Sequence, residues 1–113
     1  MSVTDELVAR FSSRGVTRGG LFYLPPPVAA EYVRACEAVD LAVTGAESFT
    51  TRGQHIHPVL ELIRDFYPDH ADDWADFRRR SNAAALAYLS ALLSRPELLV
   101  SLETLTQEEW EEE

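Results

Sequence analysis

Two carboxylates and three histidines are the side chains of this sequence best suited to acid–base chemistry. Glu47 interrupts an apolar stretch, and it would form an acid–base pair with Asp65 if the fold brought the two together beside a histidine. Carboxylates of this kind are more often simply exposed acids at a strand end or in a turn. The pair therefore suggests a small enzyme, and this hypothesis requires the two carboxylates and a histidine to lie in one pocket.

A zinc site would have to be built from His55, His57 and Cys36, with Asp65 or His70, since alternate residues of an extended segment point to the same side. A single HxH without a paired cysteine motif is weak evidence for a metal site. A cysteine on an apolar helix face is ordinarily a small core residue. No GxSxG elbow marks a serine nucleophile. The sequence therefore predicts no catalytic residue, no metal and no cofactor.

The stretch from Ile63 to Phe77 interleaves aspartates with aromatic residues. Its aromatics Phe66, Trp74 and Phe77 are predicted to lie in the core, and the aspartates could simply solvate a loop and cap the next helix. Alternatively, an exposed aromatic surrounded by charge is typical of an interface hot spot, and acids attract a basic partner. This functional interpretation predicts a partner-binding site made of Tyr67, Asp69, His70, Asp72 and Asp73.

Composition limits the classes of partner. With 113 residues, 46% of them apolar, the chain has the balance of one folded domain. Its formal net charge of −9 disfavours nucleic acid, no apolar run is long enough to cross a membrane, and acids at Asp5 and Glu6 are unlike a signal peptide. We expect a cytoplasmic protein with a globular domain over 1–107 and an acidic tail over 108–113.

Hydrophobic periodicity predicts the elements that position these residues. Ser2 to Asp5 fits a capping box before the first helix, and Gly15 is predicted to end that helix in a left-handed conformation. The predicted elements are a helix from about Thr4 to Arg14, a strand over Leu21–Leu24, a helix from Pro27 to Val39, an interrupted strand or bent strand pair over 41–51, a third helix from His57 to Phe66, and a long helix from about Asp73 to Ser94.

The C-terminal segment fits two periods. Residues 98–105 alternate as in a strand, whereas residues 94–97 fit a capping box that would begin a helix at Pro96, and we favour the strand. Residues 106–109 predict a capped final turn with Trp110 as its apolar anchor. The expected fold is α+β, a helix-dominated single domain with about four helices and a small sheet, and the alternative is all-α.

Three segments carry a resemblance to a known family. They are EAVDLAVTGAESF, the following HPVLELIRDF, and the pattern W-x-x-F-x-x-x-S-x-x-A-x-x-x-Y from Trp74 to Tyr88. In these segments the chain resembles the immunity protein 40 group, among the small bacterial immunity proteins of polymorphic toxin systems. The resemblance implies a non-catalytic protein that binds and neutralises a cognate toxin. If that toxin is a nuclease, its cleft would be basic and complementary to an acidic inhibitor.

A small regulatory or adaptor domain is the alternative function. The residues from Ala83 to Ala87 of the long predicted helix are mostly small, which would let a second copy approach closely and form a homodimer. The small enzyme that uses Glu47, Asp65 and a histidine is a third hypothesis.

Overall fold

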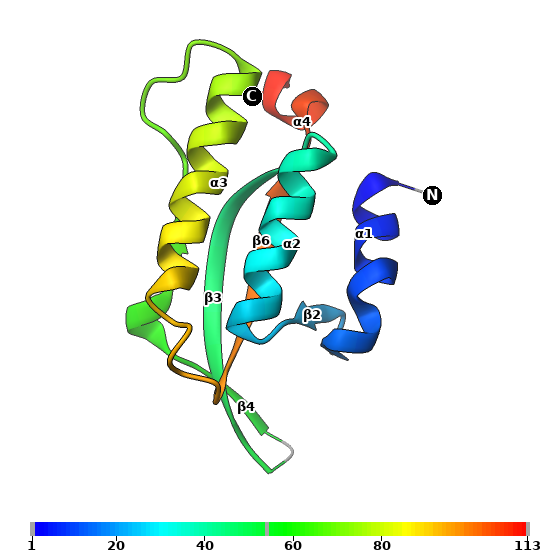
Figure 1. Ribbon diagram of the computed structural model, residues 1–113, viewed down its shortest axis with the longest axis vertical. Coiled ribbons are helices and arrows are strands. Elements are labelled where there is room, and N and C mark those ends of the chain that lie inside the picture. The colour runs from blue at the N-terminus through cyan, green and yellow to red at the C-terminus, as the bar shows by residue number, and fades with distance from the viewer. Residues whose placement is uncertain (1, 54, 113) are drawn as a thin grey trace.

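The computed structural model describes residues 2–53 and 55–112 and places two long helices on one face of an antiparallel sheet (Figure 1). In chain order the elements are α1 (Val3–Phe11), η1 (Ser12–Arg14), β1 (Val16–Arg18), β2 (Leu21–Tyr23), α2 (Pro26–Ala38), β3 (Ala42–Arg52), β4 (His55–Pro58), η2 (Leu60–Leu62), β5 (Arg64–Asp65), α3 (Trp74–Ser90), β6 (Leu98–Leu105) and α4 (Gln107–Glu111). The predicted α+β class is confirmed: the described residues form four α-helices and a small antiparallel sheet in a single domain.

Strand β3 is the centre of the sheet. β6 pairs with one edge of β3 over most of its length, while β4 and then β5 pair with the other edge. The β1–β2 hairpin joins the free edge of β6 through a bridge in which Leu24 and Val100 exchange backbone hydrogen bonds of 2.9 and 2.8 Å. The strand favoured for residues 98–105 is therefore confirmed; it pairs with β3 along one side, and the Leu24–Val100 bridge lies on its other side.

One continuous strand replaces the interrupted strand or strand pair predicted over 41–51. The pairing of β3 with β6 shifts register between Val43 and Gly45, so Thr44 is the extra residue of a bulge. The Thr44 carbonyl accepts a hydrogen bond of 2.9 Å from the Phe66 backbone instead. The bulge explains why the sequence pattern breaks near Gly45 although the strand does not.

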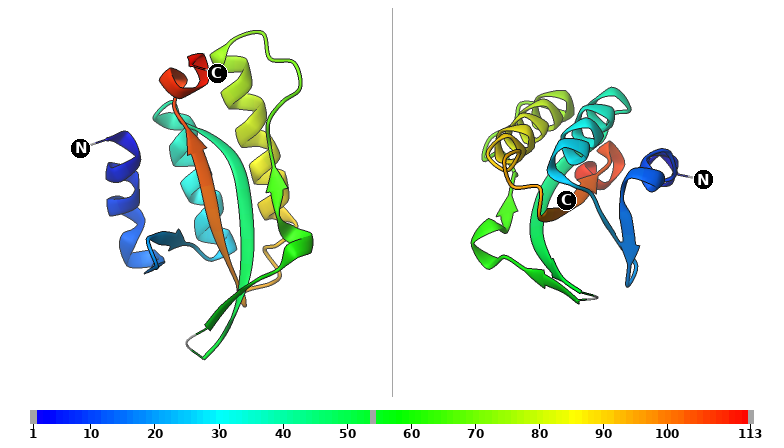
Figure 2. Two further views of the ribbon diagram at one scale, coloured as in Figure 1. Left: turned by 180° about the vertical axis from the view of Figure 1, so that it is seen from behind. Right: turned by 60° about the horizontal axis from the view of Figure 1, so that its bottom comes forward.

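The two faces of the sheet differ in what covers them. Helices α2 and α3 pack together and cover one face, and α1 packs beside α2 (Figure 2). The main core lies under α2 and α3 and contains Val33, Cys36, Leu89 and Val100, each fully buried. No α-helix of the described residues covers the opposite face (Figure 2). None of the helices described is long and apolar enough to cross a membrane.

The first helix begins as predicted but ends differently. The Ser2 hydroxyl accepts a hydrogen bond of 3.0 Å from the Asp5 backbone at the start of α1. The predicted left-handed conformation of Gly15 is wrong, because its φ of −134° is extended. A glycine is needed there for another reason, since a Cβ atom would lie 2.7 Å from the Tyr23 carbonyl oxygen. Close approach of the two backbones, rather than helix termination, selects this residue.

The third helix predicted from His57 to Phe66 is wrong. Residues 55–58 form strand β4, which pairs with residues 49–52, and η2 and β5 follow it. Val59, Leu62 and Phe66 do pack on the core, and their spacing is what suggested a helix. A 3-10 turn followed by an extended segment produces the same spacing, and the open edge of β3 provides hydrogen bonds that a helix here would forgo.

A second, smaller core joins the C-terminal helix to the start of α3. The capping box predicted for residues 106–109 is confirmed at the start of α4. The Trp110 ring lies 5.8 Å from the Trp74 ring and 5.7 Å from the Phe77 ring, measured between centroids. Trp74, Phe77 and Phe66 are buried, as predicted. Residues 107–111 thus lie against the domain rather than extending from it.

Two polar side chains of α3 hold the bulged part of β3. The Asn82 amide oxygen accepts a hydrogen bond of 2.7 Å from the Val43 backbone, and its amide nitrogen donates to Glu37 and to the Leu41 carbonyl at 2.8 and 3.0 Å. The Ser81 hydroxyl donates to the Val43 carbonyl. Because Asn82 is only 3% exposed, the backbone groups it binds have little access to water in its absence. This network connects α2, α3 and β3.

We predict that Asn82→Ala lowers the free energy of unfolding by about 1–3 kcal/mol, because a buried donor and a buried acceptor of the backbone lose their partner. Urea denaturation followed by tryptophan fluorescence measures it. Ser90→Ala, on an exposed position of the same helix, is the control and should stay within about 0.5 kcal/mol of the wild type. Equal stability of the two variants would contradict the assigned role of Asn82.

Candidate functional site

The five residues predicted to bind a partner lie together in one loop. Residues 66–73 connect β5 to α3 and cross one end of the long helix (Figure 1). Each of the five side chains is exposed, and the Tyr67 ring rests edge-on against the buried Phe77 ring at 5.4 Å between centroids. The structure therefore places Tyr67, Asp69, His70, Asp72 and Asp73 on a continuous stretch of surface chain.

Hydrogen bonds to α3 fix this loop. The Asp73 carboxylate caps the helix by accepting a hydrogen bond of 2.8 Å from the Asp76 backbone. The Asp76 carboxylate in turn accepts a hydrogen bond of 3.1 Å from the Asp72 backbone, and Arg80 donates to the His70 carbonyl. Asp73 is thus engaged by the helix, while the Asp69 and Asp72 carboxylates have no ion-pair partner among the described residues.

Asp76 is the electrostatic centre of this joint. The backbone N–H of Asp72 is the largest cause that holds the pKa of the Asp76 carboxyl below its ordinary value of 3.8. Desolvation by burial opposes this, and the guanidinium groups of Arg80 and Arg79 add to the lowering. The ion pairs with Arg79 and Arg80 have the i,i+3 and i,i+4 spacing of a helix surface. These arginines are therefore committed to α3 rather than forming a basic patch.

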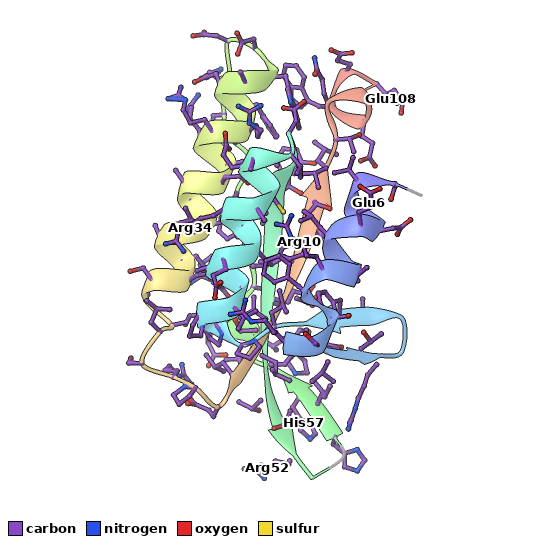
Figure 3. All side chains as sticks on the ribbon, turned by 45° about the vertical axis from the view of Figure 1, so that its right-hand side comes forward. Glu6, Arg10, Arg34, Arg52, His57 and Glu108 are labelled. Carbon is purple, nitrogen blue, oxygen red and sulfur yellow. The ribbon has the colours of Figure 1, made fainter. Side chains whose placement is uncertain are left out.

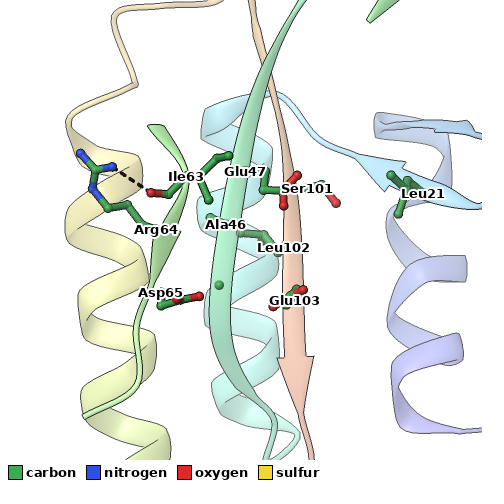
Figure 4. A pocket seen from close by; sticks show the side chains of 10 residues that line it. Leu21, Ala46, Glu47, Ile63, Arg64, Asp65, Ser101, Leu102 and Glu103 are labelled. Carbon is green, nitrogen blue, oxygen red and sulfur yellow. Dashed lines mark hydrogen bonds between the residues drawn. The ribbon is translucent and has the colours of Figure 1, made fainter. Parts of the chain in front are cut away.

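A second group of acids lies on the helix-free face of the sheet. Glu47 and Asp65, the predicted acid–base pair, line one open pocket of about 300 Å³ together with Glu103 (Figure 4). The other lining residues are Leu21, Gly45, Ala46, Ile63, Arg64, Ser101 and Leu102. The structure therefore brings together two carboxylates that sequence analysis could only pair conditionally, and adds a third.

Gly45 lies between two of these carboxylates. Asp65 and Glu103 are its cross-strand partners on the two neighbouring strands, and a Cβ atom at Gly45 would lie 2.9 Å from Glu103 Oε2 and 3.6 Å from Asp65 Oδ1. The Arg64 side chain turns away from the carboxylates and donates to two backbone carbonyls of its own turn (Figure 4). Among the described residues, none of the three carboxylates has an ion-pair partner.

The histidines and the cysteine do not join this pocket. His57 lies on the β3–β4 hairpin, which projects from the body (Figure 3), and so does His55 at the start of β4. His70 lies in the 66–73 loop. Cys36 is buried in the main core, where burial raises the pKa of its thiol to about 12, so the thiol stays protonated near neutral pH. Within residues 2–53 and 55–112, no three His, Cys, Asp or Glu side chains are grouped to hold a metal ion.

Glu103 is the carboxylate that sequence analysis missed. The alternation of residues 98–105 put it on the face opposite Leu98 and Val100, and the strand itself was predicted. Its partners depend on the register of β6 against β3, however, and register is set by the whole sheet rather than by local pattern. The pocket can present concentrated negative charge beside apolar surface, but the described residues provide it with no histidine.

The capping role of Asp73 generates a prediction. Asp73→Ala should lower the free energy of unfolding by about 1 kcal/mol because the first turn of α3 loses its side-chain acceptor. Asp73→Asn removes the charge but keeps an acceptor oxygen, so its stability should match the wild type. Thermal or urea unfolding of both variants checks this, and equal loss in both would contradict a capping role for the side-chain oxygen.

The lowered pKa of Asp76 generates a second prediction. Because the folded state binds a proton at Asp76 less readily than the unfolded state, its contribution is fully present above pH 3.8 and is lost as pH falls through the lower folded pKa. Asp76→Asn should therefore flatten the decline of unfolding free energy on the acid side. Asp69→Asn makes the same substitution at an exposed position of the 66–73 loop and serves as the control. An unaltered slope in Asp76→Asn would contradict the electrostatic assignment.

Comparison with known proteins adds no relative to this picture. No protein-family model matches the chain, and no match was found among curated proteins or solved structures. The resemblance to immunity proteins therefore remains a prediction from the sequence. What can be said of function rests on the two acidic surfaces described above, the 66–73 loop and the pocket on the helix-free face.

Proposed function

We propose that this protein is an immunity protein that binds a cognate bacterial toxin and neutralises it without catalysis, through acidic surface that complements a basic region of the toxin. One observation carries the proposal. The chain uses many of its arginines internally, whereas acids on two surfaces are left without ion pairs. The arginines with carboxylate partners are Arg14, Arg78, Arg79, Arg80 and Arg95.

Preformed negative surface suits an inhibitor of a basic protein. Electrostatic complementarity raises the rate of association, and a loop already held by hydrogen bonds loses little conformational entropy on binding. The 66–73 loop meets the second condition through the bonds made by Asp73, Asp76 and Arg80. An acidic inhibitor of this kind would block a basic cleft by occupying it.

The adaptor alternative keeps one observation in its favour. On α3, Ala83, Ala84 and Ala87 are exposed rather than buried inside the domain, so this surface is accessible to a second copy. Small exposed residues alone do not distinguish a dimer interface from a solvated helix face. Sedimentation of the purified protein separates the alternatives, because a monomer at high concentration argues against the homodimer.

The neutralisation test uses the product of the adjacent gene as the candidate toxin. We expect co-expression to rescue growth and the two proteins to form a complex. If no complex forms and growth is not rescued, the proposed function is contradicted for that pair.

The contribution of the loop is tested separately with Asp72→Arg. Only the Asp72 backbone is used in the fold, so the reversal should slow toxin association by about two- to tenfold without unfolding the domain, most strongly at low salt. Glu6→Arg on α1 makes the same change of charge away from the loop and serves as the control (Figure 3). Equal association rates for both variants would assign the loop a purely structural role.

A further inference from the structure

The helix-free face of the sheet is a surface with a defined pattern. Glu47 lies opposite Ser101, and Gly45 lies between Asp65 and Glu103, so all of these positions share one face. Their neighbours along β3 point the other way, as shown by the hydrogen bond of 2.5 Å between the Ser48 and Tyr88 hydroxyls. The carboxylates are thus directed away from the main core by the parity of the strands.

Apolar side chains flank these carboxylates from opposite edges of the sheet. Leu21 on β2 is 49% exposed, and Ile63, just before β5, is 42% exposed (Figure 4). Farther along the same face, the rings of Tyr23 and Phe49 pack edge-to-face at 5.1 Å between centroids. Exposed apolar side chains beside these carboxylates give this face both the contact area and the charge that a protein partner can use.

We infer that this face seats an arginine side chain of a protein partner, with apolar residues on either side of that arginine resting on Leu21 and Ile63. This inference rests on the proposed function and names the surface and the partner chemistry. A guanidinium group is planar, carries five N–H donors and binds carboxylates in a bidentate manner. Its apolar stem can lie along aliphatic side chains while its charged end reaches Asp65 and Glu103.

Charge complementarity distinguishes this occupant from others. A second copy of the chain would bring one acidic face against another, and the net charge of −9 makes such pairing unfavourable. Nucleic acid is excluded from this face by the same sign of charge. The volume of about 300 Å³ is at the lower limit of small-ligand sites, which suits one inserted side chain.

Gly45 provides a variant that alters the shape of the pocket without altering its charge. A Cβ atom there meets the end of the Glu103 side chain at 2.9 Å, and the nearest backbone atom, the Arg64 carbonyl oxygen, at 3.4 Å. Because the end of a glutamate side chain can move, Gly45→Ala should displace the Glu103 carboxylate and leave the fold intact. Glu103→Gln is the complementary variant, which removes charge and keeps shape.

The test uses two short peptides as probes, Leu-Arg-Leu amide and the same peptide with citrulline in place of arginine. Backbone amide resonances of the ¹⁵N-labelled full chain are followed during titration. We expect the arginine peptide to shift Gly45, Ser101 and Glu103, and citrulline to shift them far less because it lacks the charge. Glu103→Gln and Gly45→Ala should each weaken the arginine-dependent shifts by about two- to fivefold. Glu6→Gln, on α1, should leave them unchanged.

Three results would overturn the inference. They are shifts concentrated at residues 69–73 or 107–112, equal shifts with both peptides, and concentration-dependent shifts of the same face in the absence of peptide, which would indicate a second copy. Spectra of the variants that resemble the wild-type spectrum in the absence of peptide verify folding independently of binding.

The outcome is separable from the proposed function. Toxin neutralisation that survives in Glu103→Gln and Gly45→Ala would overturn the assigned surface and leave the immunity function intact. Conversely, localised binding of the arginine peptide without any neutralisation would reject the toxin as partner while supporting an arginine-binding face.

Discussion

The hydrogen bonds between the Val43 backbone and the side chains of Ser81 and Asn82 are the interaction on which the architecture depends. Val43 lies beside the bulge of β3; it pairs with Thr104 of β6, and α3 supplies side-chain partners for its backbone N–H and carbonyl. The bulge changes which side chains of β3 point to each face of the sheet. Gly45 and Glu47, which follow the bulge, therefore lie on the helix-free face. A polar contact under α3 therefore determines which side chains reach the opposite surface of the sheet.

Local chemistry was readable from the sequence, and long-range pairing was not. Ser2, Asp73 and the capping box of residues 106–109 begin helices as predicted, because a cap depends on neighbours within one turn. The helix predicted over 57–66 failed because its apolar spacing is shared by an edge strand followed by a 3-10 turn. Choosing between them requires knowledge that β3 has an unfilled edge, which no local window contains.

The same limit applies to the candidate sites. The loop residues from Tyr67 to Asp73 are contiguous, so their common location followed from the sequence once the joint was recognised. Glu47, Asp65 and Glu103 meet only because three strands align in one register. The two surfaces also differ physically: one is a loop tied to a helix end, and the other is a sheet face with apolar borders.

The position of β6 has a consequence for how the chain folds during synthesis. β6 lies between β3 and the β1–β2 hairpin, so strands made early are joined through a strand that is synthesised after both of them. Until Leu105 has left the ribosome, the apolar side of β3 and the helices above it have no completed sheet to pack on. Such distant pairing slows folding and leaves apolar surface exposed to chaperones and proteases in the interval. The supply of folded protein would then be governed by the synthesis and docking of β6 as much as by the final stability of the domain.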